Sequence, residues 1–529
     1  MCAKNDEDSL LTTLMDLLNH RGFIAPTAEI YPSRIAGFYD FGPLGVLLKD
    51  NITELWRDIF VREPLEPIVY EISGAIVLPE DVLIASGHAE SFDDPVVNCS
   101  NPKCDAALRA DHLIEDVVER SVESLTIEEL NQLIEENDIK CPSCGKDLEP
   151  IQNFNLMLDV DVGASHNSQH GYLRPETAQS IFLNYRMVQR SMRAKLPFGI
   201  AQIGNSFRNE ISPRQGLIRM RAFNQMEIET FVDPQKVDEH PEIEKVKDVK
   251  INFIPQKPQI EATKNELPDP DHEEHTIGDL LESGDIINQY LGYYMGKEEE
   301  YYSRLGIPHE AIRFRHMTPA ETPFYSKGNY DIEINTSVGW KEVVGNAYRT
   351  DHDLSTHEEH SNTKLQYHDQ PTKRKFTPHV IEPSFGVERT FYSILEHCYR
   401  EKGHDRDWAW FQFPPEIAPR QVHIYPLSRK DKLTNKAKEV FLMFKKEKIE
   451  SLYDQRGSIG KRYARADEIG TPYCVTIDYD TVEKEPSMVT IRDRDTTDQV
   501  VVPVSEVVDK IKQLVKGEIE FLDAGEKFN

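Results

Sequence analysis

The spacing of hydrophobic positions changes several times along this chain. Leucines recur at helical spacing over 8–20, and residues 44–60 repeat that spacing before the strand-like run IVYEI at 68–72. Residues 198–232 alternate between apolar and polar positions on both sides of a turn-rich loop, and residues 330–350 alternate again. The pattern predicts two helices, then an antiparallel hairpin with a long loop, then further strands.

The last third of the chain predicts a strand that leads directly into a helix, followed by a second domain. HVIEPSFG at 379–386 has the composition of a strand, and residues 387–401 continue as a helix. A proline-rich linker follows at 411–419. From residue 420 onward strands and helices alternate, which predicts a separate α/β domain of about 100 residues.

Two acidic segments interrupt these patterns. Residues 113–139 and 233–310 combine helical stretches with an excess of Asp and Glu, and we interpret both as insertions. They carry most of the net charge of −30, so the rest of the chain has room for a local basic face. The overall charge argues against a protein that coats nucleic acid non-specifically.

Length and composition set the broad class. The 529 residues are too many for one core and predict three or four domains. No apolar run reaches about 18 residues, so we expect no membrane span. The acidic N-terminus lacks the basic-then-apolar order of a signal peptide. We therefore expect a cytoplasmic protein.

Four of the seven cysteines occur in two close pairs. The pairs are Cys99-x4-Cys104 and Cys141-x2-Cys144, which have the number and spacing of a closed tetrahedral Zn²⁺ site. Four thiolate ligands leave no open position, so such a zinc would be structural. Reduced buried cysteines or a redox pair are the alternatives.

Charged residues gather in the predicted hairpin, beginning with Phe207-Arg208-Asn209-Glu210. On a strand, Arg208 and Glu210 would point to the same face, where they could hold a phosphate and an adenine amino group. The alternative is an exposed cross-strand ion pair. On the predicted second strand, Arg219 and Arg221 share one face, and Glu227 and Glu229 share another. Such a face suggests an anionic ligand that also carries a cationic group.

A second charged motif, Gly386-Val387-Glu388-Arg389, lies at the predicted junction of strand and helix. Gly386 permits a ligand to approach the backbone closely. The helix N-terminus offers free N–H groups and the positive end of the helix dipole, and Arg389 adds a full charge. The alternative is an ordinary turn with a surface arginine.

These two motifs, in this order, resemble motifs 2 and 3 of the class II aminoacyl-tRNA synthetases. The helix and strand at 44–70 then resemble motif 1, with Pro64 or Pro67 as its proline. The chain is most similar to the dimeric glycyl-tRNA synthetases of the archaeal and eukaryotic type, through LRPETAQ (173–179), SFRNEISPRQGLIRMRAFNQMEIE (206–229), EPSFGVER (382–389) and GSIGKRYARADEIGTP (457–472). The resemblance covers nearly the whole chain except 233–310. The single Gly386 departs from the glycine-richer third motif of many class II members.

The resemblance implies an α+β fold. Its catalytic domain would be built on an antiparallel β-sheet with flanking helices and insertions, followed by a C-terminal α/β anticodon-binding domain. The implied parts are catalytic core at 1–82, 164–232 and 311–417, a cysteine-containing insertion at 83–163, an acidic insertion at 233–310, and an anticodon-binding domain with its tail at 418–529. Motif 1 in the first part would form a homodimer.

The implied reaction joins glycine to ATP as glycyl-adenylate and then transfers glycine to the 3′ end of tRNA(Gly). Arg208 would bind the α-phosphate and Arg389 the γ-phosphate. Glu210 would accept from the adenine amino group, Phe223 would stack on the base, and Glu342 would hold Mg²⁺ between phosphates. The full implied ATP site is Arg208, Asn209, Glu210, Ile218, Arg219, Phe223, Glu342, Val343, Gly386, Val387, Glu388 and Arg389.

Glycine offers only an ammonium and a carboxylate for recognition. Glu176, Glu227 and Glu382 are our candidates for the ammonium, and Arg109 would meet the carboxylate. Ser384 would crowd the α-carbon and so exclude larger amino acids. The full implied substrate site is Arg109, Glu176, Phe223, Asn224, Gln225, Met226, Glu227, Glu382, Pro383, Ser384, Phe385 and Gly386. Without the resemblance, each glutamate could equally be a solvated surface acid.

The C-terminal domain carries a basic segment with one aromatic residue. Arg456, Lys461, Arg462 and Arg465 surround Tyr463, a composition that suits a single-stranded RNA loop. A solvated helix face is the alternative here. For the whole chain, the alternatives are a class II synthetase for another small amino acid and a non-catalytic synthetase-like binding subunit. The presence of all four ATP-handling charges favours the enzyme.

Overall fold

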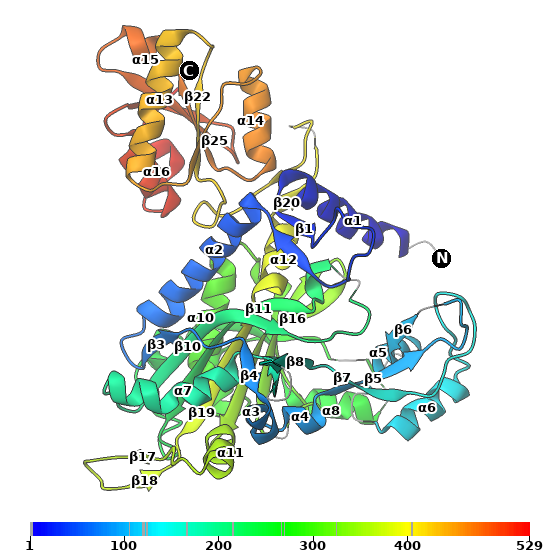
Figure 1. The fold of residues 1–529 in the computed structure, drawn as a ribbon. Helices are drawn as coiled ribbons and strands as arrows, with labels where there is room; N and C mark the ends of the chain where they lie inside the picture. The colour runs from blue at the N-terminus through cyan, green and yellow to red at the C-terminus, as the bar shows by residue number, and fades with distance from the viewer. Residues whose placement is uncertain are drawn as a thin grey trace.

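The computed structural model describes residues 4–528 except 105, 119–121, 123–124, 165–167, 214–215, 266, 269, 324 and 404–405. Figure 1 shows a large body built around a sheet, a lobe beside it that contains α5 and α6, and a C-terminal domain above it. Among the described residues, no helix combines the length and apolar character needed to cross a membrane.

The large body is organised by a nine-stranded mixed sheet in the order β13-β12-β14-β15-β16-β19-β11-β10-β3. The pairs β12–β14 and β10–β3 are parallel, and all other neighbours are antiparallel. The strands are β3 (Ile68–Ile72), β10 (Phe198–Phe207), β11 (Ala222–Val232), β12 (Lys250–Ile254), β13 (Glu273–Thr276), β14 (Ile312–His316), β15 (Asn329–Thr336), β16 (Gly339–Thr350) and β19 (His379–Gly386). The expected antiparallel sheet therefore forms its centre.

Helices cover both faces of this sheet. On one face α2 (Pro43–Arg57), α10 (Gln289–Arg304) and α12 (Val387–Cys398) bury their apolar residues in the main core. On the other face α7 (Ala178–Ser191) and α11 (His352–Ser361) pack a second cluster around Phe198 and Phe231. Because side chains alternate along β11, Met226 and Ile228 enter the main core. Glu227 and Glu229 therefore face the α7 side.

Residues 233–310 do not form the separate insertion that we expected. Their strands β12 and β13 extend the sheet, and α10 contributes Tyr290, Tyr294 and Tyr301 to the main core. The acidic composition suggested an insertion, but some of these acids, including Glu298 and Glu299 on α10, are themselves buried. The segment is part of the large body.

The cysteine-containing lobe packs around a small core of its own. It comprises β5 (Asp93–Asn98), β6 (Ala107–Arg109) and β7 (Gln152–Asn155), with α5 (Ala110–Val118) and α6 (Ile127–Glu136). Both predicted helices therefore lie between the cysteine pairs. Thr126 and Glu129 close the start of α6 with a capping box, which satisfies its free N–H groups.

The C-terminal domain has the predicted alternation of strands and helices and a separate hydrophobic core. Its sheet order is β23-β22-β24-β25-β26-β27. The strands are β22 (Val422–Pro426), β23 (Ser451–Tyr453), β24 (Tyr473–Ile477), β25 (Met488–Asp493), β26 (Gln499–Pro503) and β27 (Glu526–Lys527), and the helices are α13 (Asp431–Lys446), α14 (Ile459–Glu468), α15 (Tyr479–Glu483) and α16 (Val507–Val515).

The remaining elements connect these parts. They are α1 (Lys4–Arg21), β1 (Ile24–Pro26), β2 (Tyr39–Phe41), β4 (Val77–Pro79), α3 (Glu80–Ala85), α4 (His88–Ser91), β8 (Leu158–Val162), β9 (Gln169–Leu173), α8 (Gln256–Lys264), α9 (Ile277–Ser283), β17 (Tyr367–His368), β18 (Lys375–Phe376), β20 (Tyr399–Arg400) and β21 (Trp410–Phe411). The predicted helices at 8–20 and 44–60 correspond to α1 and to α2 with the turn that follows it.

Candidate functional site

The two predicted charged motifs meet in one cleft of about 650 Å³ over β11, β16 and β19. Arg208 enters it from the loop after β10, and Arg389 enters it from the first turn of α12. The cleft is lined by Arg208, Glu210, Leu217, Ile218, Arg219, Met220, Phe223, Gln225, Glu342, Val343, Ser384, Gly386, Glu388 and Arg389. Three guanidiniums, those of Arg208, Arg219 and Arg389, therefore share a site that also contains the ring of Phe223.

The sequence predicts that the arginines of motif 2 lie on strands. In the structure they lie in the loop between β10 and β11. Strand β10 ends at Phe207 and β11 begins at Ala222. The Arg221 guanidinium donates to the backbone oxygens of Glu210 and Ala36, which holds the loop away from the ladder. Side-chain alternation therefore does not apply to these residues, although Arg208 and Glu210 still reach the cleft.

Arg208 is held by two aromatic rings. Its guanidinium lies 5.3 Å from the centroids of both Phe92 and Phe223, and its Nε donates to the Pro175 oxygen at 3.3 Å. Cation–π contacts of this kind stabilise an arginine without neutralising it. Arg208 therefore keeps its charge for an anionic ligand.

Arg389 is positioned by Glu342 on β16. Its Nη1 donates to the Glu342 backbone oxygen at 2.8 Å and to the carboxylate at 2.9 Å, and its Nε donates to the Ile218 oxygen at 3.2 Å. Burial alone would raise the pKa of Glu342, but the charge of Arg389 brings that pKa below its ordinary value. Glu342 is therefore a carboxylate and can serve as a ligand for a divalent cation.

Glu388 joins motif 3 to motif 2. Its carboxylate accepts from the Asn224 backbone N–H at 2.7 Å and from the Asn224 side chain at 2.6 Å, although burial raises the pKa of Glu388. These bonds fasten the start of α12 to the start of β11. Glu388 and Asn224, both predicted to bind ligands, therefore hold the two motifs together.

Several other predicted residues do not line the cleft. Met226, Phe385 and Val387 bury their side chains in the main core, on the far side of the sheet. Pro383 is buried within β19, and the Asn209 N–H donates to the Leu156 oxygen. The sequence motifs are contiguous, but alternation along a strand directs only part of each motif to the cleft.

A cluster of carboxylates, called the carboxylate pocket below, lies next to the cleft. Gln225 and Ser384 line the cleft and hydrogen-bond to Glu227 of this cluster. Glu227 is almost fully buried, and one of its oxygens accepts from the Ser384 hydroxyl at 2.5 Å. Its other oxygen accepts from the hydroxyl of Thr177. Burial and then the charge of Glu176 raise the pKa of Glu227. A cationic group entering this pocket would offset both effects.

Arg349 organises this pocket, and sequence reasoning missed it. It donates to Glu382 at 2.8 Å and to the two oxygens of Asp353 at 2.8 and 3.0 Å, and it lies 3.9 Å from Glu176. Burial raises the pKa of Glu382 to about 8 even though Arg349 opposes that shift. The spacing of Arg349 and Asp353, four residues apart next to a predicted strand, was the available signal.

Glu176 joins the same group from the turn before α7. Gln179 donates to it at 2.8 Å, and His88 lies 3.5 Å from its other oxygen. Burial would raise the pKa of Glu176, but His88 and Arg349 together lower it. The three glutamates that we expected to capture an ammonium are therefore gathered around Arg349.

Arg109 is placed elsewhere. Its guanidinium lies 3.0 Å from Asp94 and donates to Asp111, both in the cysteine-containing lobe. Together they line a separate cavity of that lobe. The structure therefore does not bring Arg109 to the carboxylate pocket where we expected it.

The four paired cysteines come together as the spacing predicts. Their sulfur atoms all lie within 4.8 Å of one another, with Cys99 and Cys144 at 3.4 Å and Cys104 and Cys141 at 3.9 Å. All four are free thiols. Backbone N–H groups donate to the sulfurs, and the Lys146 N–H lowers the pKa of Cys144 to about 7. The pKa of Cys99 is raised to about 12 and that of Cys104 is also raised, because hydrogen bonds among the thiols and burial outweigh the backbone N–H groups there.

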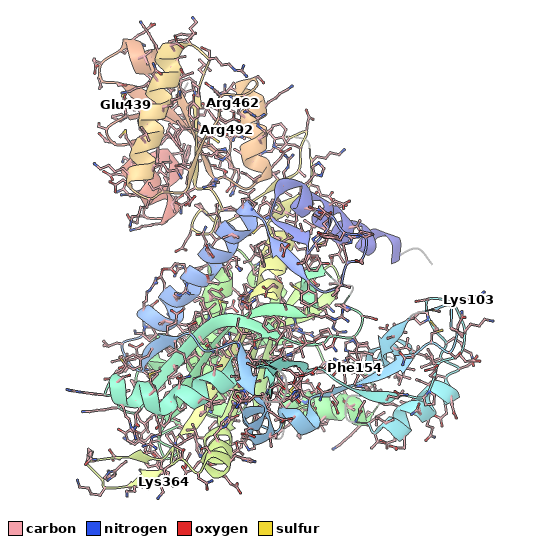
Figure 2. The ribbon with its side chains drawn as sticks, viewed as in Figure 1. Lys103, Phe154, Lys364, Glu439, Arg462 and Arg492 are labelled. Carbon is pink, nitrogen blue, oxygen red and sulfur yellow. The ribbon has the colours of Figure 1, made fainter. Side chains whose placement is uncertain are left out.

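The basic residues of the C-terminal domain divide into two groups. Arg462 is buried and donates to the Pro426 oxygen at 2.7 Å, and Figure 2 shows it with Arg492 inside the domain. Tyr463 contacts Thr476, and Arg465 pairs with Asp454. Arg456 and Lys461 remain exposed. The expectation that Arg462 presents its charge to RNA is wrong, because the side chain supports β22 from within.

Comparisons with known protein families match two parts of the chain. A model described as tRNA synthetase class II core domain (G, H, P, S and T) matches residues 160–253, and one described as anticodon binding domain matches residues 421–514. The first match contains the motif 2 loop with Arg208, and the second contains the C-terminal sheet. Both agree with the class II synthetase fold that the resemblance implies.

Full-length relatives decide the family. Glycine–tRNA ligases of Thermococcus sibiricus and Pyrococcus furiosus are each 38% identical to this chain over 95% of its length, covering 98% and 99% of their own. That of Methanocaldococcus jannaschii is 37% identical over 96% of the chain and covers its own full length. The chain belongs to the glycine–tRNA ligase family.

A solved structure supports the same fold for this member of the glycine–tRNA ligase family. Prolyl-tRNA synthetase of Giardia lamblia in complex with prolyl-adenylate matches 97% of this chain and 79% of its own, with a TM-score of 0.58 at 14% identity. The protein therefore has the class II core, here with a large mixed sheet, and a C-terminal anticodon-binding α/β domain.

Proposed function

We propose that this protein activates glycine with ATP and transfers it to the 3′ end of tRNA(Gly). The observation that supports this most strongly is the placement of Arg208 and Arg389 in one cleft, next to a cluster of buried carboxylates that Ser384 of the cleft contacts. The cations of such a site can pair with a polyphosphate, and its anions can pair with an ammonium. Glycyl-adenylate formation needs a cationic and an anionic part, because it joins an amino acid to a nucleotide.

The cleft binds ATP through charge and stacking. Arg208 meets the α-phosphate, where negative charge develops as the glycine carboxylate attacks and pyrophosphate leaves. Arg389 holds the γ-phosphate, Phe223 stacks on adenine, and Glu210 accepts from the adenine amino group. A Mg²⁺ ion held by Glu342 would neutralise phosphate charge. The protein supplies no nucleophile, because the substrate carboxylate is itself the nucleophile.

The carboxylate pocket binds the glycine ammonium. Glu176 and Glu227 face the incoming charge, and Glu382 stands behind them with its charge partly offset by Arg349. Ser384, bonded to Glu227, closes the space next to the α-carbon. A pocket that only fills space discriminates one methylene by about 1–3 kcal/mol, so rejection of alanine requires a clash.

ATP–pyrophosphate exchange with each proteinogenic amino acid tests this function. We expect exchange with glycine and none with serine, threonine or proline. Exchange with another small amino acid would support the alternative synthetase, and exchange with none would support a non-catalytic binding subunit. Charging of tRNA(Gly) with labelled glycine then tests the second step.

We propose that the four cysteines hold a structural Zn²⁺ ion. Sulfurs of a tetrahedral site with Zn–S bonds of about 2.3 Å lie about 3.8 Å apart. The separations of 3.4 and 3.9 Å in this cluster bracket that value. The ion would link the turn around Cys99 to the turn around Cys141 and so fix the end of the lobe.

Metal analysis of the purified protein tests this site. We expect about one zinc per chain, lost in Cys141→Ser and retained in Cys474→Ser, because four thiolate ligands bind zinc as a unit. Cys474 is the control because it is a buried free thiol of the C-terminal domain. Unchanged zinc in Cys141→Ser, or an intact wild type without zinc, would contradict the proposal.

We propose that the C-terminal domain binds the anticodon region of the tRNA. Deleting it should spare adenylate formation and reduce tRNA charging strongly. Phe413 and Ile417 belong to the main core, and Asn51 donates to the Ile417 and Ala418 oxygens, so the cut belongs after Pro419. Comparing the rates of pyrophosphate exchange and tRNA charging in the truncated protein tests whether the two steps depend on different domains. An equal loss of both activities would argue against this division.

We propose that the protein is a homodimer joined through the outer edge of the sheet. Strand β3 is the last strand in the sheet order, so its outer backbone groups are available for pairing. Ile68 is 53% exposed and Leu65 is 75% exposed at this edge.

We also propose that the protein is cytoplasmic. The free thiols of the described cysteines fit the reducing environment of that compartment.

Light scattering after size-exclusion chromatography tests the dimer. Ile68→Glu should convert it to a monomer, because a charge would be buried without a partner in the joined edge. Ile30→Glu is the control, since Ile30 is also exposed but lies in the loop after β1. A monomeric wild type, or a dimer that tolerates Ile68→Glu, would reject this interface.

A further inference from the structure

Glu229 is the buried carboxyl that the proposed reaction leaves unexplained. It lies two residues after Glu227 on β11, it is fully buried, and neither of its oxygens has a hydrogen-bond partner within the described part of the chain. One carboxylate oxygen from each of Glu227, Glu229 and Glu382 lies within 4.8 Å of the others. Glu229 therefore forms the floor of the carboxylate pocket.

The charges around this floor do not balance if every carboxyl is ionised. Five acids surround the pocket, and the cationic groups beside them are one guanidinium, one incoming ammonium and, when it is protonated, the imidazole of His88 next to Glu176. The acids are Glu176, Glu227, Glu229, Glu382 and Asp353, and the guanidinium is that of Arg349. At least one of the acids must keep its proton, because unpaired buried charges are costly.

The proton belongs on Glu229 because its neighbours have better partners. Glu227 accepts from Ser384 and Thr177, and Glu382 accepts from Arg349. Burial raises the pKa of Glu229 well above its ordinary value, and the charge of Glu382 raises it further. The charged or titratable groups that face Glu229 are Glu227 on β11, Glu382 on β19, Arg349 on β16, Asp353 on α11 and Tyr294 on α10.

We propose that Glu229 stays protonated and donates its O–H to Glu382, which makes it a positioning residue for the glycine pocket. An oxygen of Glu229 lies within 4.8 Å of one of Glu382, and the bond would shorten that separation to about 2.5–3.0 Å. The bond would fix Glu382 against Arg349 and leave Glu227 and Glu176 as the charges that meet the ammonium. This inference rests on the proposed function.

Two substitutions distinguish the role of the Glu229 proton as a hydrogen-bond donor from the role of the side-chain volume. Glu229→Gln keeps a neutral donor, so the KM for glycine in pyrophosphate exchange should stay within about twofold of wild type. Glu229→Met fills the space without a donor, so the KM for glycine should rise about tenfold while that for ATP is unchanged. Equal impairment by both would mean that the charge is needed, and tolerance of both would mean that Glu229 only fills space.

Thermal melting without ligands tests the proton directly. The folded protein keeps a proton that the unfolded chain releases, so this group lowers stability as the pH rises above the unfolded pKa. Glu229→Gln cannot lose a proton, so its melting temperature should exceed that of wild type at about pH 8, and the gap should narrow near pH 5. A constant gap would overturn the inference. A wild type without glycine-dependent exchange would refute the proposed function, and melting would still decide the proton.

Discussion

Replacing Arg389 with alanine should lower glycine-dependent pyrophosphate exchange by about 10³-fold or more, because an arginine that stabilises phosphoryl charge contributes that much to the rate. The substitution removes the proposed γ-phosphate contact and also frees Glu342 from its 2.9 Å partner. Glu342 then becomes an unpaired carboxylate facing the phosphates. We expect the loss mainly in kcat, since the interaction strengthens as charge develops.

Arg374→Ala is the matched control for this prediction. Arg374 is exposed to a similar extent as Arg389, 33% against 38%, and it also pairs with a carboxylate, that of Asp233 at 2.8 Å. It lies beside the β17–β18 hairpin, away from the cleft. If Arg374→Ala reduced exchange as much as Arg389→Ala, the effect would come from lost stability and not from phosphate binding.

Ser384→Leu should raise the KM for glycine by about 100-fold or more and leave the KM for ATP close to wild type. The larger side chain occupies the space of the α-carbon, and the lost hydroxyl removes the 2.5 Å bond to Glu227. Glycine is the smallest amino acid, so the variant should not gain activity with a larger one. Titration of glycine and ATP in the exchange assay measures both constants.

Ser384→Ala separates the two effects of this substitution. It removes the hydroxyl without adding volume, so it should raise the KM for glycine by about tenfold, as expected for one lost hydrogen bond to a buried charged group. Equal KM values in the alanine and leucine variants would show that the hydroxyl, and not the crowding of the α-carbon, sets the affinity. Normal exchange by Ser384→Leu would remove Ser384 from the pocket.

The sequence predicted the individual helices and strands better than it predicted how the chain divides into domains and insertions. The helices at 8–20 and 44–60 and the strand and helix around Gly386 were readable because their apolar spacing is regular. The segment 233–310 was misread because its acids dominate its composition. Its membership of the sheet depends on the parallel pairing of β12 with β14, which no local pattern reports.

The sequence predicted many residues of the candidate site, but it did not predict which side chains point into the cleft. Arg208 and Arg389 reach one cleft as expected, and the cysteines gather as their spacing predicts. Arg349 was missed because a single arginine on a strand has no motif, and Arg109 was misplaced because its partners Asp94 and Asp111 belong to its own lobe. The partners Asp111 and Asp353 are close to their arginines in sequence, but only the tertiary structure shows which of these pairs lies beside the cleft.

The two bonds from Asn224 to Glu388 have a consequence for how the site meets its substrate. They tie the helix that carries Arg389 to the strand that follows the Arg208 loop. The two backbone segments from which the guanidiniums reach the cleft are therefore tied to each other without a nucleotide. If a triphosphate pairs with both guanidiniums as we propose, this junction of strand and helix limits the shapes that it can adopt.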